Sequence, residues 1–166
     1  MKKFFAILLA VAMMATMSVT AFATTIDGDS GTVEITYGVE DSYVVTIPAS
    51  ITLSAGEAST MEISAADVVI GYGEQLTVSV SSTNYADSKW YLVDTANAEN
   101  KLEYSVKSGE NAVASGDAVL TVAAGSTDAT TVTLSTQLID SATVSGTYKD
   151  TITFTVNVAE APATEG

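Results

Sequence analysis

The sequence predicts an all-β protein, built as a single antiparallel β-sandwich of immunoglobulin-like type. Short segments in which apolar and polar residues alternate with a period of two recur throughout residues 32–158, and they are rich in β-branched residues. Turn-forming clusters separate these segments, and no long amphipathic helical pattern occurs between them. Eight or nine short strands at such regular spacing are typical of a two-sheet sandwich or barrel.

The alternating segments place the expected strands in order along the chain. The candidate strands are 33–37, 43–47, 59–63, 76–81, 90–93, 102–106, 118–122, 130–134 and 151–158. The polar or glycine-containing segments 71–74, 94–100, 108–111 and 123–128 are expected to be turns. Only residues 65–70, AADVVI, could hold a helical turn.

The last expected strand has the cleanest alternation. Its apolar residues, Ile152, Phe154, Val156 and Val158, are predicted to face the core, with the threonines between them in water. The pattern therefore predicts a loss of roughly 3–5 kcal/mol for Phe154→Ala, and well under half of that for Thr153→Ala. Tyr148 follows Gly146 at the start of this strand, which is the setting of a tyrosine corner.

The N-terminus has the pattern of a secretory signal peptide. Lys2 and Lys3 precede a short apolar run, and Ala21-Phe22-Ala23 has the form of a signal-peptidase site. We therefore expect a signal peptide at 1–23, a mature chain from Thr24, a flexible leader at 24–31, the sandwich domain at 32–158 and a flexible tail at 159–166. The alternative, an uncleaved anchor, needs about 20 apolar residues, and the run is shorter than that.

The charge and the missing residue types limit the compartment and the partners. Residues 24–166 carry 4 lysines against 20 acidic residues, a formal charge of −16, which disfavours nucleic acid and anionic lipid as partners. No membrane association is expected after signal cleavage. An exported chain without cysteine favours a bacterial source, and we expect a Gram-positive one.

The composition also excludes most catalytic chemistry. The chain has no histidine, cysteine or arginine, so catalytic triads with histidine, Cys–His dyads and the usual zinc sites cannot be built. Pairs of carboxylates are unavoidable among 20 acidic residues and carry no information about a glycosidase. The sequence therefore predicts a protein that is not an enzyme, with no catalytic residues, no metal and no cofactor.

The aromatic residues are the remaining candidates for ligand binding. Tyr85, Trp90 and Tyr91 cluster within TNYADSKWYLVD. On a loop edge they could form a stacking platform for a sugar, whereas an inward Trp90 would be the core residue that sandwiches commonly bury. We favour the core position for Trp90 and keep the platform as the alternative.

The C-terminal segment resembles the distal motif of the WxL cell-surface domains of Gram-positive bacteria, which reads Y-x-x-x-L-T-W-x-L. Tyr148 is followed after three residues by Ile152-Thr153-Phe154-Thr155-Val156, with Phe154 and Val156 in place of the motif's Trp and Leu. Upstream, Trp90-Tyr91-Leu92 fits the literal W-x-L pattern. The segment GTYKDTITFTV is also similar to the last strand of spore-coat and fimbrial subunit domains.

The resemblance implies a protein of the extracellular cell surface. WxL domains attach noncovalently to peptidoglycan or to partner surface proteins, so a cell-wall glycan or another surface protein is the implied partner. The sequence thus predicts an exported structural or adhesive β-sandwich associated with the cell envelope. A carbohydrate-binding module and a pilin-like subunit that assembles by strand addition at an exposed edge are the alternatives.

Overall fold

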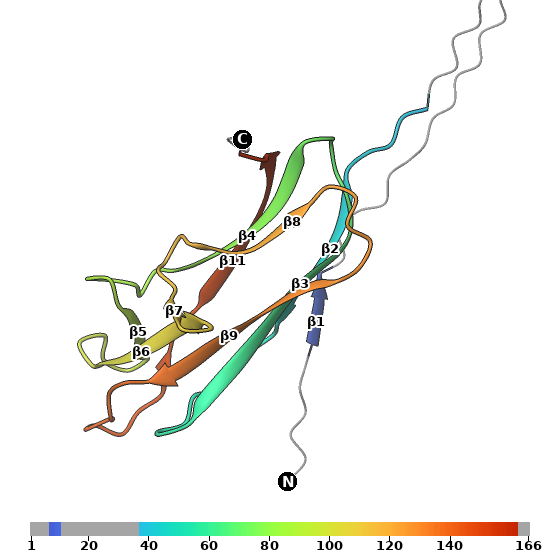
Figure 1. Ribbon diagram of the computed structural model, residues 1–166. Helices are drawn as coiled ribbons and strands as arrows, with labels where there is room; N and C mark the ends of the chain where they lie inside the picture. The colour runs from blue at the N-terminus through green and yellow to red at the C-terminus, as the bar shows by residue number, and fades with distance from the viewer. Residues whose placement is uncertain (1–6, 11–36, 163–166) are drawn as a thin grey trace, which may run out of the picture.

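The computed structural model describes residues 7–10 and 37–162, and every regular element in these ranges is a β-strand (Figure 1). The strands are β1 (Ile7–Ala10), β2 (Ser42–Pro48), β3 (Ala58–Val69), β4 (Glu74–Ser82), β5 (Trp90–Asp94), β6 (Lys101–Ser108), β7 (Asn111–Ala112), β8 (Ala118–Ala123), β9 (Thr130–Leu138), β10 (Tyr148–Lys149) and β11 (Ile152–Glu160). Within the described ranges no helix occurs that could span a membrane.

Two antiparallel sheets pack face to face, as the alternation predicted. The larger sheet has the order β1-β2-β3-β9-β6-β5-β10, with β7 added to β6, and the smaller sheet has the order β11-β4-β8. Figure 1 shows the strands of the small sheet lying alongside β3 and β9 of the large one and running in roughly the same direction across the view. The predicted fold class, an immunoglobulin-like β-sandwich, is therefore confirmed.

The core lies between β4 and β8 on one side and β3, β6 and β9 on the other. In the middle of β4 the alternate residues Leu76, Val78 and Val80 are fully buried, and the neighbouring strands β8 and β11 cover both edges of β4. The largest fully buried apolar side chains come from three of these central strands: Ile63, Val68, Leu76, Val78, Val80 and Leu134.

Residues 65–69 form the end of β3, not the helical turn that the sequence of 65–70 allowed. A β-bulge interrupts the pairing here, because Ser42 and Val44 of β2 lie opposite Val69 and Ala66 of β3. The extra residues include Asp67, whose φ of 51° is one that aspartate tolerates better than most residues. The bulge changes the alternation, so that Ala65 and Val68 are both buried although they are three positions apart in the sequence.

The other expected strands of residues 42–158 begin within two residues of their predicted starts, but β3 and β9 continue six and four residues beyond their predicted ends at 63 and 134. The short strands β7 and β10 were not predicted. β11 continues to Glu160, so the regular structure runs into the segment predicted as tail. Of the expected strand 33–37 only Tyr37 is described, and it is exposed and outside any strand. The leader at 24–31 and the cleavage site lie outside the described residues, whereas residues 7–10 of the expected signal form β1.

The chain changes sheet between β10 and β11. Tyr148 and Lys149 pair with β5 in the large sheet, and two residues later Ile152 begins the pairing with β4 in the small sheet. The hydroxyl of Tyr148 donates a hydrogen bond to the carbonyl oxygen of Val144, 3.0 Å away, which is the contact that a tyrosine corner makes. This crossing brings the start of β11 over the end of β2, where the candidate site lies.

Candidate functional site

The side of the sandwich between β2 and β11 is incompletely covered. β11 is an edge of the small sheet and pairs only with β4. β2 pairs with β3 on one edge and, over residues 45–48, with β1 on the other. Each of the two strands has an apolar row that packs on the core but remains half-buried: Tyr43, Val45 and Ile47 in β2, and Ile152, Phe154, Val156 and Val158 in β11.

The apolar row of β11 is less buried than the row of β4 beside it. In the register, Phe154, Val156 and Val158 lie opposite Val80, Val78 and Leu76 of β4, which are at most 1% exposed. The two rows share one face of the same sheet, so the difference in burial comes from the missing neighbour beyond β11. We call the open side bounded by these rows of β2 and β11 the edge groove.

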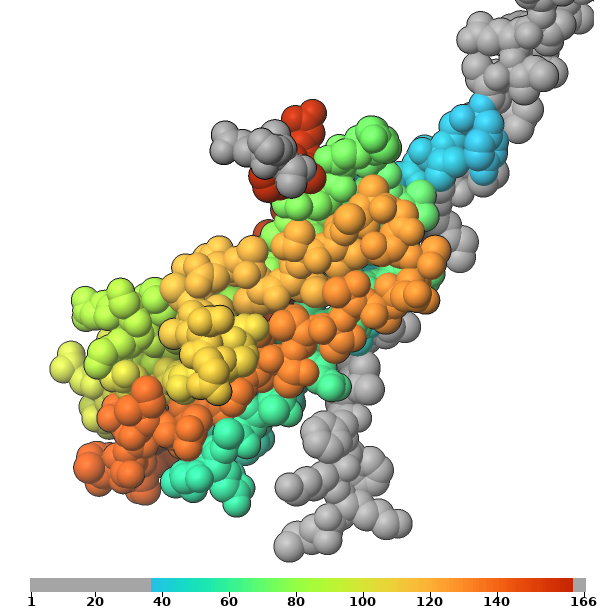
Figure 2. Space-filling view, in the orientation of Figure 1, coloured from blue at the N-terminus to red at the C-terminus, as the bar shows by residue number. Residues whose placement is uncertain are grey.

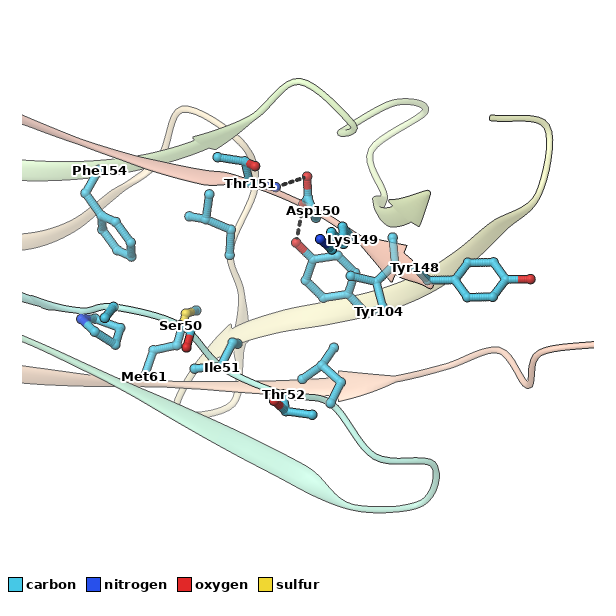
Figure 3. A pocket seen from close by; sticks show the side chains of 15 residues that line it. Ser50, Ile51, Thr52, Met61, Tyr104, Tyr148, Lys149, Asp150, Thr151 and Phe154 are labelled. Carbon is cyan, nitrogen blue, oxygen red and sulfur yellow. Dashed lines mark hydrogen bonds between the residues drawn. The ribbon is translucent and has the colours of Figure 1, made fainter. Parts of the chain in front are cut away.

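The edge groove widens into a pocket of about 460 Å³ at the end of β2. Its walls are the segment 48–53, the start of β11 and side chains of the large sheet, among them Met61 and Tyr104. Figure 3 shows Phe154 pointing into this space from one layer, with Ile51 and Met61 on the other side. The lining contains a single carboxylate, Asp150, so the pair of carboxylates that a glycosidase needs is not present in it.

Asp150 joins the two sheets at the pocket. Its Oδ2 accepts a hydrogen bond from the hydroxyl of Tyr104 in β6 at 2.5 Å, and its Oδ1 accepts one from the hydroxyl of Ser82 in β4, also at 2.5 Å. Asn84 Nδ2 and the backbone N–H of Thr151 donate to the same Oδ1 at 3.0 and 2.7 Å. Both carboxylate oxygens are thus held by donors, and Figure 3 shows the contacts with Tyr104 and Thr151.

The ionisation of Tyr104 reflects this environment. Burial of the phenol raises its pKa far above the usual value near 10, and the hydrogen bond to Asp150 and the charge of that carboxylate raise it further. Tyr104 is therefore a neutral donor at all physiological pH values. Its hydrogen bond to Asp150 connects β6 to the segment that leads into β11.

The structure does not form the platform of Tyr85, Trp90 and Tyr91 that was the alternative to a core position for Trp90. Trp90 is only 3% exposed, and its Nε1–H donates to the carbonyl oxygen of Val113 at 2.8 Å. Tyr85 packs edge-on against the Trp90 ring, with the ring centroids 5.0 Å apart. Tyr91 is the next residue along β5, so it points to the opposite face. The core position of Trp90 is confirmed, and no surface presents the three rings together.

The predicted residues of the last strand do come together at the site. Ile152 and Phe154 line the pocket, Val156 continues their row along the edge groove, and Tyr148 lies at the pocket rim. Sequence reasoning found the alternating row of β2 as the strand 43–47, but it assigned no place at a site to this row, to Tyr104 or to Asp150. Asp150 could have been noticed in the sequence because it is an acidic residue directly before a long alternating strand.

The half-burial of Phe154 lowers the expected cost of its removal. Phe154→Ala should reduce the free energy of unfolding by about 2 kcal/mol, below the range for a fully buried aromatic ring, because part of the ring already contacts solvent. Thr153→Ala is the control on the outer face, and it should cost less than about 0.5 kcal/mol. Urea titrations of both variants measure the difference. Equal losses in the two variants would contradict the assignment of the faces.

No protein-family model matches this chain, and no curated protein is significantly similar to it. Among solved structures, the chain is similar to one in the CsuC–CsuE chaperone–tip adhesion subunit pre-assembly complex from archaic chaperone–usher Csu pili of Acinetobacter baumannii. That match has 17% identity and a TM-score of 0.48, and it covers 69% of this chain and 39% of the other. A second match is a chaperone–tip adhesin complex of CFA/I fimbriae biogenesis, with 16% identity, a TM-score of 0.42 and coverage of 70% and 36%.

The chain spans well under half the length of both solved chains. The class that the strand topology defines is an antiparallel β-sandwich of immunoglobulin-like type. Its most distinctive feature is the edge groove, where the core is left partly uncovered between two edge strands.

Proposed function

We propose that this is an exported, non-catalytic surface protein with a structural or adhesive role, and that it binds a partner protein by β-strand addition at the edge groove. The observation that carries the proposal is the pair of half-buried apolar rows on β2 and β11, which belong to different sheets and are not hydrogen-bonded to each other. An added strand would pair with a free edge and cover these rows with its own apolar residues.

The groove suits a polypeptide better than a sugar. The half-buried side chains along it are mostly aliphatic, and Trp90, the strongest candidate for stacking on a sugar, is in the core. A strand presents alternating apolar residues and unpaired backbone groups, which match an apolar row and a strand edge at the same time. A surface protein is therefore the proposed partner, while attachment to wall glycan and membership of the WxL group stay predictions from the sequence.

The proposal is tested by the location of variants in cells that export the protein. Val156→Lys places a charge in the apolar row of β11, whereas Thr155→Lys places the same charge on the exposed outer face of the same strand. The wild type and Thr155→Lys should be recovered with the cell envelope, and Val156→Lys should be released into the medium at least tenfold more. Immunoblots of the two fractions measure this ratio.

A second variant separates loss of binding from loss of folding. Val45→Lys alters the opposite wall of the groove, in β2, and should be released in the same way. Thermal unfolding of the purified variants checks that each has a cooperative transition. Retention of both folded groove variants, or release of the wild type, would overturn the proposed function.

A further inference from the structure

The edge of β2 accepts a strand in this structure. β1 pairs with it in antiparallel register, from Ile7 opposite Pro48 to Ala10 opposite Val45. β1 belongs to the segment 1–23 that we expect to be removed on export, so the processed chain has lost the strand that covers this edge. The same removal uncovers the side of the groove on which Val45 and Ile47 lie.

The processed chain carries a segment with a strand pattern just before the described sandwich. In TVEITY, residues 32–37, apolar Val33, Ile35 and Tyr37 alternate with polar Glu34 and Thr36. Six residues in extended form cover roughly 20 Å, which is close to the length of the seven-residue strand β2. An inserted copy of this segment would turn its apolar residues to the groove and Glu34 to water.

The chain leaves the sandwich in a direction that favours insertion into another molecule. Residues 37–41 contain no turn, all are exposed, and Tyr37 is 73% exposed. Figures 1 and 2 show this segment projecting away from the body beyond the start of β2. Pairing of residues 32–37 with the β2 edge of their own chain would require the chain to reverse within residues 38–41, because a hairpin joins its two strands by a tight turn.

We propose that residues 32–37 of one processed molecule add as a strand to the β2 edge of a second copy and cover its edge groove. This inference rests on the proposed function, and it names the partner as another copy of this chain. Each molecule would give one strand and receive one, so the contact is head-to-tail and generates open chains of subunits. The subunits carry −16 each, so added salt should strengthen the association by screening their repulsion.

The test uses the processed chain, residues 24–166, in sedimentation velocity and light scattering. The wild type should form species larger than a monomer, with a mass that increases with protein concentration and with salt from 50 to 500 mM. Ile35→Asp should weaken the association at least tenfold, whereas Thr36→Asp, which adds the same charge on the other face of the segment, should leave it within about twofold. Residues 35 and 36 lie outside the described sandwich, and neither substitution alters a described core residue.

Mixing two defective variants tests the head-to-tail arrangement. Ile35→Asp damages the strand that is given, and Val156→Lys damages the groove that receives it. Each variant alone should be monomeric, and an equimolar mixture should form a dimer and nothing larger, because only one intact junction is possible.

Two results would overturn self-association: a wild type that stays monomeric at all salt concentrations, or equal association of Ile35→Asp and Thr36→Asp. The fractionation of cells described above distinguishes this inference from the proposed function. If the wild type is monomeric in solution but Val156→Lys is still released from the envelope, the edge groove binds a different surface protein. If neither experiment distinguishes the variants, both proposals fail.

Discussion

Replacement of Trp90 with alanine is expected to lower the free energy of unfolding by about 3–5 kcal/mol. The indole is almost fully buried, lies against Tyr85 and Tyr104, and donates its N–H to the carbonyl oxygen of Val113. Alanine would leave a large cavity and an unsatisfied carbonyl oxygen in the segment between β7 and β8. Denaturant titration followed by circular dichroism measures the loss, which is a large part of the 5–15 kcal/mol typical of a domain.

Two further variants identify the source of this loss. Trp90→Phe keeps an aromatic ring against Tyr85 but removes the donor to Val113, and it should cost about 1–2 kcal/mol beyond any change in packing. Tyr91→Ala, on the opposite face of β5, should cost less than half as much as Trp90→Ala. If Tyr91→Ala proved the more damaging, a role for Trp90 as a core anchor would be wrong.

The starts and the faces of the longer strands of residues 42–160 were predictable because they depend on local alternation. The pattern of β11 correctly places Phe154 on the core side and Thr153 outside. Whether a strand is central or at an edge depends on which other strands pair with it, and those partners are far away in the sequence. β4 and β11 have similar alternation, yet only β4 has neighbours on both edges, and only its apolar row is fully buried.

Two other features could not be derived from local patterns. The bulge at Asp67 changes the alternation of β3, and no glycine marks its position in the sequence. Residues 65–70 therefore lost the period-two pattern of a strand and were compatible with a helical turn. The partners of Asp150 lie 46 and 68 residues away in Tyr104 and Ser82. Contacts over such separations are fixed by topology, which alternation does not specify.

Asp150→Ala is expected to lower the free energy of unfolding by about 2–4 kcal/mol, because hydrogen bonds to a charged acceptor contribute more than neutral ones. The substitution leaves the buried hydroxyl of Tyr104 without its acceptor and removes the link between β6 and β4. Asp140→Ala is the matched control: its Oδ2 accepts a hydrogen bond from the backbone N–H of Glu103 at an exposed position, and its loss should stay below about 1 kcal/mol.

A double-mutant cycle with Tyr104→Phe shows whether the contact itself carries the effect of Asp150→Ala. If the hydroxyl and the carboxylate stabilise each other, the double variant should be less destabilised than the sum of the single variants, by at least about 1 kcal/mol. The carboxylate also lies in the pocket wall beside Ile152, so its loss should loosen the end of the groove where β11 begins. Hydrogen exchange of the β11 amides should then increase more than that of β9. Additive single effects together with unchanged exchange in β11 would contradict a role for Asp150 in joining the two sheets at the edge groove.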